Sequence, residues 1–444
     1  MDYANQYRNK LRTPEEAVKA VKSGDWVEYP SGTDFPVLCD AALAKRRDEL
    51  TDVKVRGQVI YGPIQVVECD PEQEHFIYSS WHCSGYERSL CDRGLCFYQP
   101  MIFRNIYWYY RNFLKVNVAF ACVAPMDKHG YFNCSVASGL VRAGLDVADV
   151  VVLEVNENMP RICGGSGESI HISDVDFIVE GKHDPMVQIK AKTPTETDVK
   201  IAENIIPYIS NGSTLQLGIG GIPDALGQIL ANSDLKDLGM HTEMCTDAYL
   251  ALYNAGKLTN AKKSIHNGRG VMGFAVGTQP LYDWLDNNPG FVTYPVDYVN
   301  SPDVIGQIDN FVSLNGCVSI DLYGQVCSES AGTRHISGTG GQLDFVTGAA
   351  MSGGGKSFLC TASTFTDKSG KTHSRIVPFF NGDIVTVPRS QAYYIATEHG
   401  VVNLAGRTSW ERAEMLISVA APEFRDDLIR AAQEQRIWRK SNKR

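Results

Sequence analysis

Apolar residues in this chain are grouped in short strand-like runs that alternate with helix-like stretches. In the first half, residues 26–30, 53–60, 116–123 and 150–155 are rich in β-branched and aromatic side chains, which is typical of buried strands. Thr13-Pro14-Glu15-Glu16 predicts a helix start, because Thr13 can cap it and Glu16 completes a capping box. We expect this helix to continue through Val21. Strands that alternate with helices predict an α/β domain with a largely parallel sheet.

The same pattern resumes after a polar, proline-punctuated stretch at residues 182–198. A helix is predicted at 199–206 and a strand at 214–217. Further strands are expected at 291–295, 311–314, 318–322, 358–361, 384–386 and 394–396, and terminal helices at 412–420 and up to Leu428. A chain of this length exceeds one ordinary core. We therefore predict two α/β domains, residues 1–190 and 191–444.

Composition and charge narrow the classes of function. Hydrophobic residues make up 43% of the chain and charged residues 21%, and the net charge is −9. An acidic chain is a poor partner for nucleic acid, which needs a basic surface. No apolar run approaches a membrane span, and the start shows no secretory signal. We expect a cytoplasmic protein that does not bind membranes.

The 12 cysteines are scattered, and no Cys-x-x-Cys pair occurs. Cys91 and Cys96 have no matching second pair and no nearby histidine, so the spacing does not predict a zinc site. We expect buried thiols in a reducing compartment and no bound metal.

A glycine turn, Gly218-Ile219-Gly220-Gly221-Ile222-Pro223, follows the strand at 214–217 and opens a helix. Such a junction directs backbone N–H groups towards a phosphate or a developing oxyanion. The glycine spacing differs from the dinucleotide-binding fingerprint. A purely structural tight turn explains the motif equally well.

Glu243 lies in His241-Thr242-Glu243-Met244, ahead of a helix predicted at 247–254. We expect it to lie between two regular segments. A carboxylate held there can attack an activated carbonyl and carry the acyl group covalently. The alternative is an exposed carboxylate that the nearby helix N-terminus favours.

A second glycine cluster, Ser337-Gly338-Thr339-Gly340-Gly341-Gln342, offers main-chain donors for an oxyanion. Glu329 precedes it in a loop of small residues. A third cluster at 352–356 ends at Lys356, and we predict a hairpin there.

Taken together, these motifs resemble the family I CoA-transferases of the acetyl-CoA hydrolase/transferase type. The resemblance covers nearly the whole chain, and its nearest branch contains the butyryl-CoA:acetate and 4-hydroxybutyrate CoA-transferases. The segments that carry it are 154–160, 171–174, 218–223, 241–244, 295–298, 321–326 and 337–345. It implies two similar open α/β domains of the ribose-5-phosphate isomerase-like type, with the active site between them.

The resemblance also implies roles for individual residues. The nucleophile falls on Glu243, and a rival is Glu329, because other branches place theirs in a Ser-Glu-x-Gly setting. Oxyanion and active-site support fall on Asn300, Gly340 and Gly341. The residues expected to bind CoA are Gly218, Ile219, Gly220, Gly221, Ile222, Asn315, Gly341 and Lys356.

The implied reaction is a ping-pong transfer of CoA from a short-chain acyl-CoA to a carboxylate, through a glutamyl-CoA thioester on Glu243. Butyryl-CoA and acetate are the first candidates as substrates. The alternatives are 4-hydroxybutyrate transfer, acyl-CoA hydrolysis and a non-catalytic effector-binding protein. CoA thioester is then a substrate, no tightly bound cofactor is required, and a homo-oligomer (a dimer or a tetramer) is expected. The roles of residues 29–35 and 81–88 in acyl-chain preference stay open.

Overall fold

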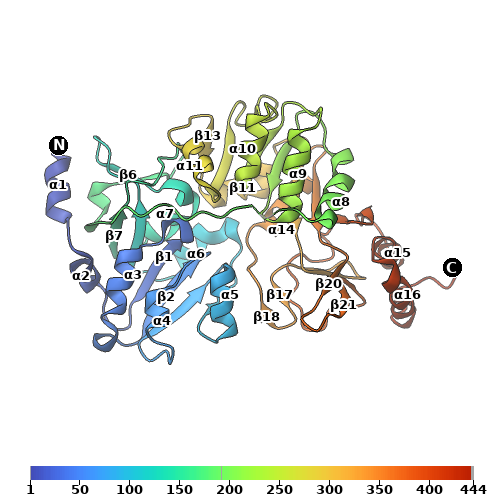
Figure 1. Cartoon of the computed structure of the whole chain (residues 1–444), viewed down its shortest axis with the longest axis horizontal. Coiled ribbons are helices and arrows are strands. Elements are labelled where there is room, and N and C mark those ends of the chain that lie inside the picture. Colours follow the sequence, from blue (N-terminus) through green and yellow to red (C-terminus); the bar gives the residue numbers. More distant parts are fainter. Residues whose placement is uncertain (1, 192, 442–444) are drawn as a thin grey trace. The chain divides into compact units, whose positions relative to one another are not determined.

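The computed structural model describes residues 2–191 and 193–441, and the chain divides into two compact units (Figure 1). The first unit runs to Lys190 and also includes Glu243–Cys245 and Val271–Val299. The second comprises Ala191–Thr242, Thr246–Gly270 and the chain from Asn300 onwards.

The first unit is built on a seven-stranded sheet with the order β4-β3-β2-β1-β5-β7-β9. All the neighbouring pairs in this sheet are parallel. The strands are β1 (Trp26–Ser31), β2 (Val53–Gln58), β3 (Phe76–Ser80), β4 (Phe97–Tyr98), β5 (Val118–Val123), β7 (Val150–Val155) and β9 (Phe177–Glu180).

Both faces of this sheet are covered, and β5 shows why its sequence is apolar throughout. Val118 and Phe120 belong to one buried cluster, whereas Ala119, Ala121 and Val123 belong to another. Successive side chains of a strand point to opposite faces. A parallel strand buried on both faces therefore reads as a continuous apolar run rather than as an alternation.

The helices of the first unit are short, and two of them begin with a complete capping box, at Thr13 and at Ser84. The helix that starts after Thr13 is α-helical only to Ala17 and continues as a 3-10 turn, Val18–Ala20, so our expectation of a longer helix was wrong. The helices are α1 (Tyr3–Lys10), α2 (Pro14–Ala17), α3 (Val37–Ala44), α4 (Gln65–Glu68), α5 (Gly85–Asp92), α6 (Ile106–Asn112) and α7 (Ser138–Leu145). A small antiparallel pair, β6 (Tyr131–Asn133) and β8 (Ser169–His171), completes the unit.

The second sheet has eight strands in the order β13-β12-β11-β10-β14-β19-β23-β24. Its pairs from β11 to β23 are parallel, and β24 is antiparallel to β23. The strands are β10 (Thr214–Leu217), β11 (Gly239–Cys245), β12 (Gly270–Ala275), β13 (Phe291–Thr293), β14 (Phe311–Gly316), β19 (Lys356–Cys360), β23 (Tyr394–Thr397) and β24 (Gly400–Asn403).

The helices in the second half of the chain range from four to eleven residues, and two of them lie in the Val271–Val299 segment of the first unit. They are α8 (Glu196–Ile205), α9 (Gly221–Ala231), α10 (Asp247–Asn254), α11 (Gln279–Leu285), α12 (Val296–Val299), α13 (Pro302–Ile305), α14 (Gln342–Met351), α15 (Ser409–Ser418) and α16 (Arg425–Glu434). Figure 1 shows α15 and α16 at the carboxyl end of the chain. The remaining short strands are β15 (Ser319–Asp321), β16 (Val326–Cys327), β17 (Ser330–Ala331), β18 (Arg334–His335), β20 (Thr364–Thr366), β21 (Thr372–Ser374) and β22 (Ile376–Val377).

Two of our expectations for the second half were wrong. Residues 384–386 form no strand, because Ile384 and Val385 are exposed and the Ile384 N–H donates to the Ser330 hydroxyl. Residues 352–356 do not form a hairpin either, since they connect α14 to β19.

In both sheets the first strand lies inside, with later strands added on either side. The order reverses between β1 and β5 in one sheet and between β10 and β14 in the other. In open parallel sheets ligands bind outside the carboxyl ends of the strands at such a reversal. The repeated order gives a mixed α/β architecture with two similar sheets. Each sheet has one reversal point, which is a candidate position for a ligand site.

Candidate functional site

Glu243 lies inside a strand, three residues before Thr246, and not between two regular segments as we expected. The residues Gly239 to Thr242 of β11 are buried, and Glu243 is the first position of that strand to be partly exposed. The structure therefore places its carboxylate at the carboxyl end of a parallel strand. Side chains held by a sheet are positioned more precisely than those on loops.

The backbone around Glu243 is tightly packed. A Cβ atom added to Gly273 of β12 would lie 2.9 Å from the Glu243 carbonyl oxygen and 2.9 Å from Val296 Cγ1. The Val276 N–H donates to the Cys245 carbonyl at 3.0 Å. The main chain that carries the carboxylate is thus fixed on the β12 side.

The glycine turn begins directly after β10, at the point where the strand order of the second sheet reverses. β10 pairs in parallel with β11, with Thr214 opposite Gly239 and Leu215 opposite Met240. The turn therefore follows the carboxyl end of β10, and Glu243 lies near the carboxyl end of the neighbouring β11. The Gly218 N–H already donates to the Leu314 carbonyl at 3.3 Å, so later residues of the turn must supply any donors to a ligand.

Carboxylates surround the turn on its helical side. A Cβ atom at Gly221 would lie 2.3 Å from Asp198 Oδ2. Burial, then the neighbouring Asp247 and Asp198, raise the pKa of Asp224 to about 6. Such a setting repels phosphate, so the turn is better suited to a neutral part of a ligand.

Asn315 lies near the turn, at the carboxyl end of β14. Its Nδ2 donates to Gln216 Oε1 at 3.0 Å and to the Ser313 hydroxyl at 2.9 Å. Lys356, by contrast, is the first residue of β19 and pairs with Val312 near the start of β14. Asn315, near the end of β14, pairs with Leu359. The structure thus places Lys356 towards the amino ends of the strands, away from the turn.

The second glycine cluster leads into α14, and Gly341 is the residue before that helix. Asn300 is fully buried, and its Nδ2 donates to Asp344 Oδ2, in the first turn of α14, at 3.4 Å. The structure therefore connects Asn300, Gly340 and Gly341 through the start of one helix.

Glu329 is held in the same region but is less accessible than Glu243. It is 5% exposed, and its Oε2 accepts hydrogen bonds from the Thr386 hydroxyl at 3.0 Å and from the Thr339 hydroxyl at 3.4 Å. Burial raises the pKa of this carboxyl. Glu329 therefore ties the glycine cluster to the segment around Thr386.

A cavity of about 360 Å³ lies in the first unit, beyond the carboxyl ends of β1, β5 and β7. This is the reversal point of the first sheet. Its lining is mainly apolar and includes Phe35, Leu38, Ile60, Tyr61, Met186 and Val187. The loop at residues 29–35, which we connected with acyl-chain preference from the sequence, contributes Gly32, Thr33 and Phe35 to this lining. Sequence reasoning missed the wall formed by residues 181–187, because they read as part of a linker.

Two of the carboxylates in this lining, Glu154 and Asp40, accept hydrogen bonds from helix starts. Glu154 Oε2 accepts from the Leu38 N–H at 3.0 Å and the Cys39 N–H at 3.2 Å, in the first turn of α3. Asp40 accepts from the Gln65 N–H at 2.6 Å, and burial raises its pKa to about 7. The cavity thus offers mainly apolar surface, with the charged residues Lys182 and Asp184 on one wall.

Three hydrogen bonds connect the wall of this cavity to the strand end that carries Glu243. Val187 accepts from the Tyr282 hydroxyl at 2.7 Å, and that hydroxyl also accepts from the Gly277 N–H at 3.3 Å. Val276, the residue before Gly277, donates to Cys245. All of these residues belong to the first unit.

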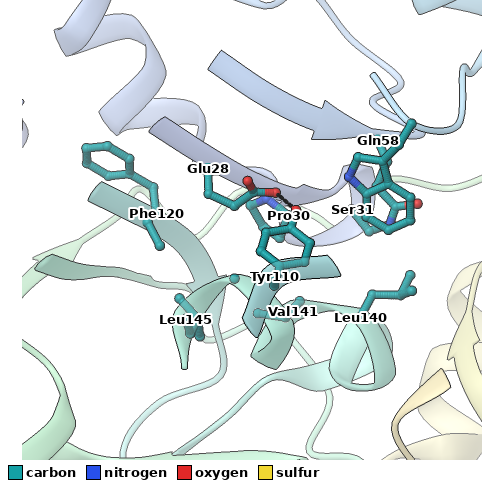
Figure 2. A pocket seen from close by; sticks show the side chains of 12 residues that line it. Glu28, Pro30, Ser31, Gln58, Tyr110, Phe120, Leu140, Val141 and Leu145 are labelled. Carbon is teal, nitrogen blue, oxygen red and sulfur yellow. Dashed lines mark hydrogen bonds between the residues drawn. The ribbon is translucent and has the colours of Figure 1, made fainter. Parts of the chain in front are cut away.

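A second, much smaller cavity in the first unit is lined by Glu28, Gln58 and Tyr110 (Figure 2). Its volume of about 10 Å³ suits about one water molecule. Glu28 accepts from Arg56 Nη1 at 2.9 Å and from the Tyr110 hydroxyl, and burial raises its pKa to about 7. Among the described residues, the fully buried Gln58 amide has no hydrogen-bond partner. This cavity is therefore a polar packing feature that is too small for a substrate.

No helix in the described part of the chain is long and apolar enough to cross a lipid bilayer.

Comparison with known proteins identifies the family. Residues 1–190 match the acetyl-CoA hydrolase/transferase N-terminal domain, and residues 277–432 match the acetyl-CoA hydrolase/transferase C-terminal domain. The chain is 48% identical to the butyryl-CoA:acetate CoA-transferase of Anaerostipes caccae, over 100% of both chains. It is 50% identical to a probable butyrate:acetyl-CoA coenzyme A-transferase of Syntrophomonas wolfei, over 99% of this chain and 98% of the other.

A solved structure is similar to this chain in fold as well as in sequence. The crystal structure of RipA from Yersinia pestis matches with a TM-score of 0.91 and 35% identity, over 98% of this chain and 100% of that one. Family models that together match most of the chain, and full-length relatives of this similarity, show one family. The chain belongs to the acetyl-CoA hydrolase/transferase family.

Proposed function

We propose that this chain is a CoA-transferase that exchanges CoA between butyryl-CoA and acetate through a covalent intermediate on Glu243. The observation that carries the proposal is the 48% and 50% identity, over essentially the whole chain, to relatives with that named activity. The position of Glu243 at the end of β11, with a fixed backbone and a partly exposed side chain, suits a nucleophile.

In the first half-reaction, a Glu243 carboxylate oxygen attacks the thioester carbonyl of butyryl-CoA. The C–S bond breaks, giving a butyryl-glutamyl anhydride and CoA thiolate. The thiolate then attacks the glutamyl carbonyl and expels butyrate, which leaves a glutamyl-CoA thioester. Covalent catalysis of this kind retains the energy of the thioester, which hydrolysis would lose.

The second half-reaction reverses these steps with acetate. Acetate attacks the glutamyl-CoA carbonyl, giving an acetyl-glutamyl anhydride and CoA thiolate. Attack of the thiolate on the acetyl carbonyl forms acetyl-CoA and restores the Glu243 carboxylate. Each tetrahedral intermediate carries an oxyanion, and one well-placed donor contributes on the order of 3 to 4 kcal/mol to its stabilisation. We assign this support to Gly340 and Gly341, with Asn300 positioning the start of α14.

For CoA binding we retain the turn from Gly218 to Ile222 together with Asn315. The carboxylates beside the turn support contact with the neutral pantetheine arm rather than with the phosphates. The position of Lys356 at the amino end of β19 removes it from the proposed set.

The apolar cavity of the first unit is our candidate for the acyl pocket. Its volume lies within the usual range for small-molecule sites, and its wall is hydrogen-bonded to Tyr282 in the segment that follows β12. A four-carbon chain would find there the apolar surface that acetate does not require.

The proposal also includes the cofactor requirement, the localisation and the assembly of the enzyme. CoA thioester is a substrate, and the reaction needs neither a tightly bound cofactor nor a metal. We propose a cytoplasmic homo-oligomer with two domains that divide near residue 190.

The experiment that tests the function uses isotopically labelled acetate with butyryl-CoA. Label in acetyl-CoA, at a rate matching butyrate release, supports transfer. Free CoA that accumulates without label in acetyl-CoA would instead identify a hydrolase. Incubation with butyryl-CoA alone, followed by borohydride, should change the mass of the peptide containing residue 243. A change in the peptide containing residue 329 would reject our nucleophile.

A further inference from the structure

Three cysteine side chains converge in the first unit, within one β3–α5–β4 segment. Cys83 follows β3, Cys91 lies in the last turn of α5, and Cys96 directly precedes β4. The Cys83 and Cys91 Sγ atoms are 3.8 Å apart, and all three Sγ atoms lie within 4.8 Å of one another. No other group of three potential metal ligands converges in this way among the described residues.

We propose that Cys83, Cys91 and Cys96 form a binding site for one thiophilic metal ion, Cu(I) or Zn(II). The proposal is independent of the function assigned to Glu243. With a metal–sulfur bond of about 2.3 Å, three thiolates lie about 3.8 Å apart in a tetrahedral site and about 4.0 Å apart in a trigonal one. The sulfur atoms therefore need to move by less than about 1 Å. Thiolate ligands select soft ions of this kind.

The backbone holds the three positions before any ion binds. Ser84 caps α5 and forms a capping box with Glu87, which fixes the residue after Cys83. After α5, Gly94 adopts a left-handed conformation (φ 74°), and its N–H donates to the Cys91 carbonyl at 3.0 Å. This turn reverses the chain and brings Cys96 back to the helix.

Access and charge also suit an ion. Cys83 and Cys96 are 4% and 6% exposed, whereas Cys91 is partly exposed and offers a way in from solvent. The groups that face the cluster are Tyr78 and the buried Glu87, which accepts the Tyr78 hydroxyl at 2.7 Å. A carboxylate there opposes a bare thiolate but attracts a cation.

Binding replaces three thiol protons, released to solvent, by one metal ion. The neighbouring thiols and burial raise the pKa of the Cys96 thiol, and the hydrogen bond with Cys91 raises that of Cys83, to which burial and Glu87 add. Metal ions must therefore displace protons at neutral pH.

The sequence did not predict this site because Cys83 is too far from Cys91 for a Cys-x-x-Cys motif. Helix α5 begins after Cys83, and its last turn places the Cys91 thiol next to that of Cys83. The motif becomes visible only once the helix and its turn are in place.

The test uses full-length protein, reduced and stripped of metal with a chelator. Cu(I) is titrated under anaerobic conditions against bicinchoninate, and Zn(II) against a chromophoric chelator in a parallel arm. We expect one ion per chain, and the arm that competes more strongly identifies the ion. Cys83→Ser and Cys96→Ser should each weaken binding by at least about 100-fold, more than the loss of a ligand's own hydrogen-bond partner costs.

Cys69→Ser is the matched control, since Cys69 is a partly exposed thiol of the same unit whose Sγ donates to the Ala44 and Val66 carbonyls. It should leave the metal affinity unchanged. Cys91→Ser, at the solvent edge, provides a second variant if a buried substitution prevents folding. Metal should raise the unfolding temperature of the wild type and Cys69→Ser but not of Cys91→Ser. Absence of binding in both arms, or binding that survives loss of Cys91 or Cys83, would overturn the proposal.

Discussion

Glu243 carries the covalent step of the proposed reaction, so the length of its side chain should matter as much as its charge. Glu243→Asp keeps a carboxylate but withdraws it by one methylene group. A displacement of about 1 Å can cost about 100-fold in rate, so kcat should fall by about that factor. Glu243→Gln should abolish exchange. The labelled-acetate assay measures both.

Circular dichroism checks that the two variants fold, and Glu203→Gln, an exposed position in α8, serves as the control that retains full activity. Undiminished turnover in Glu243→Gln would remove this residue from the mechanism.

Glu329 makes a different prediction, because its carboxylate accepts from two threonine hydroxyls. Glu329→Ala leaves these hydroxyls without their acceptor, and an unsatisfied buried group costs about 1 to 3 kcal/mol. We expect kcat to fall roughly 10-fold, as the glycine cluster loosens. Glu329→Gln retains an acceptor oxygen and should lose less. In both variants borohydride should still modify the peptide containing residue 243, and loss of that modification would contradict a positioning role.

The sequence could identify Glu243 as a candidate but could not place it in a strand. The strand is buried for most of its length, yet its segment 240–244 mixes polar and apolar residues. It therefore shows neither the continuous apolar run of a buried strand nor a regular alternation. One wall of the cavity that we propose as the acyl pocket was missed for a related reason. This wall, residues 181–187, is polar in sequence and joins the cavity only through tertiary contacts such as that of Val187 with Tyr282.

At the level of elements, the contact between α8 and the start of α9 explains why Gly221 cannot readily carry a side chain. Asp198 Oδ2 accepts from the Thr195 N–H at 2.9 Å and closes the capping box of α8. In Gly221→Ala the new methyl group would displace this carboxylate. Loss of a cap costs about 0.5 to 2 kcal/mol, and urea denaturation should show a decrease of that size in the free energy of unfolding.

The double variant Asp198→Ala/Gly221→Ala isolates the contact. If the cost arises from the displaced carboxylate, the second substitution should add little to the effect of Asp198→Ala alone. Fully additive losses would locate the strain elsewhere.

Helices and strands were predicted well where the apolar pattern of the segment favoured a single type of element. The strands at 150–155 and 214–217 and the helix at 247–254 match β7, β10 and α10 in their bounds. The predicted strand at 384–386 failed because its β-branched residues lie on the surface and its backbone bonds to a side chain. Propensity favours a strand there, but the segment meets a neighbouring strand at its end, where the Thr386 N–H donates to the Val326 carbonyl at 2.8 Å.

On the scale of the whole molecule, the first unit is assembled from segments that are distant in sequence. Buried Phe274 and Val296 belong to one of its core clusters, and the Thr293 N–H donates to the Cys163 carbonyl at 2.9 Å. A fragment of residues 1–190 lacks these partners. We therefore expect it not to fold alone, although its boundary matches a family domain.

Co-expression with residues 191–444 should restore a folded, active complex, because it returns Glu243–Cys245 and Val271–Val299 to the first unit. Size-exclusion chromatography and the CoA-exchange assay measure this. A compact, soluble fragment 1–190 with native-like near-ultraviolet circular dichroism would show that the missing segments are dispensable.

The shortness of β4 has a consequence for behaviour at high concentration. This edge strand is only two residues long, and Pro100, which has no N–H, follows soon after it. Exposed sheet edges are templates on which copies of a protein can stack into aggregates. Here a second molecule would find too little backbone to extend the ladder, so this edge of the parallel sheet is protected against self-association in a crowded cell.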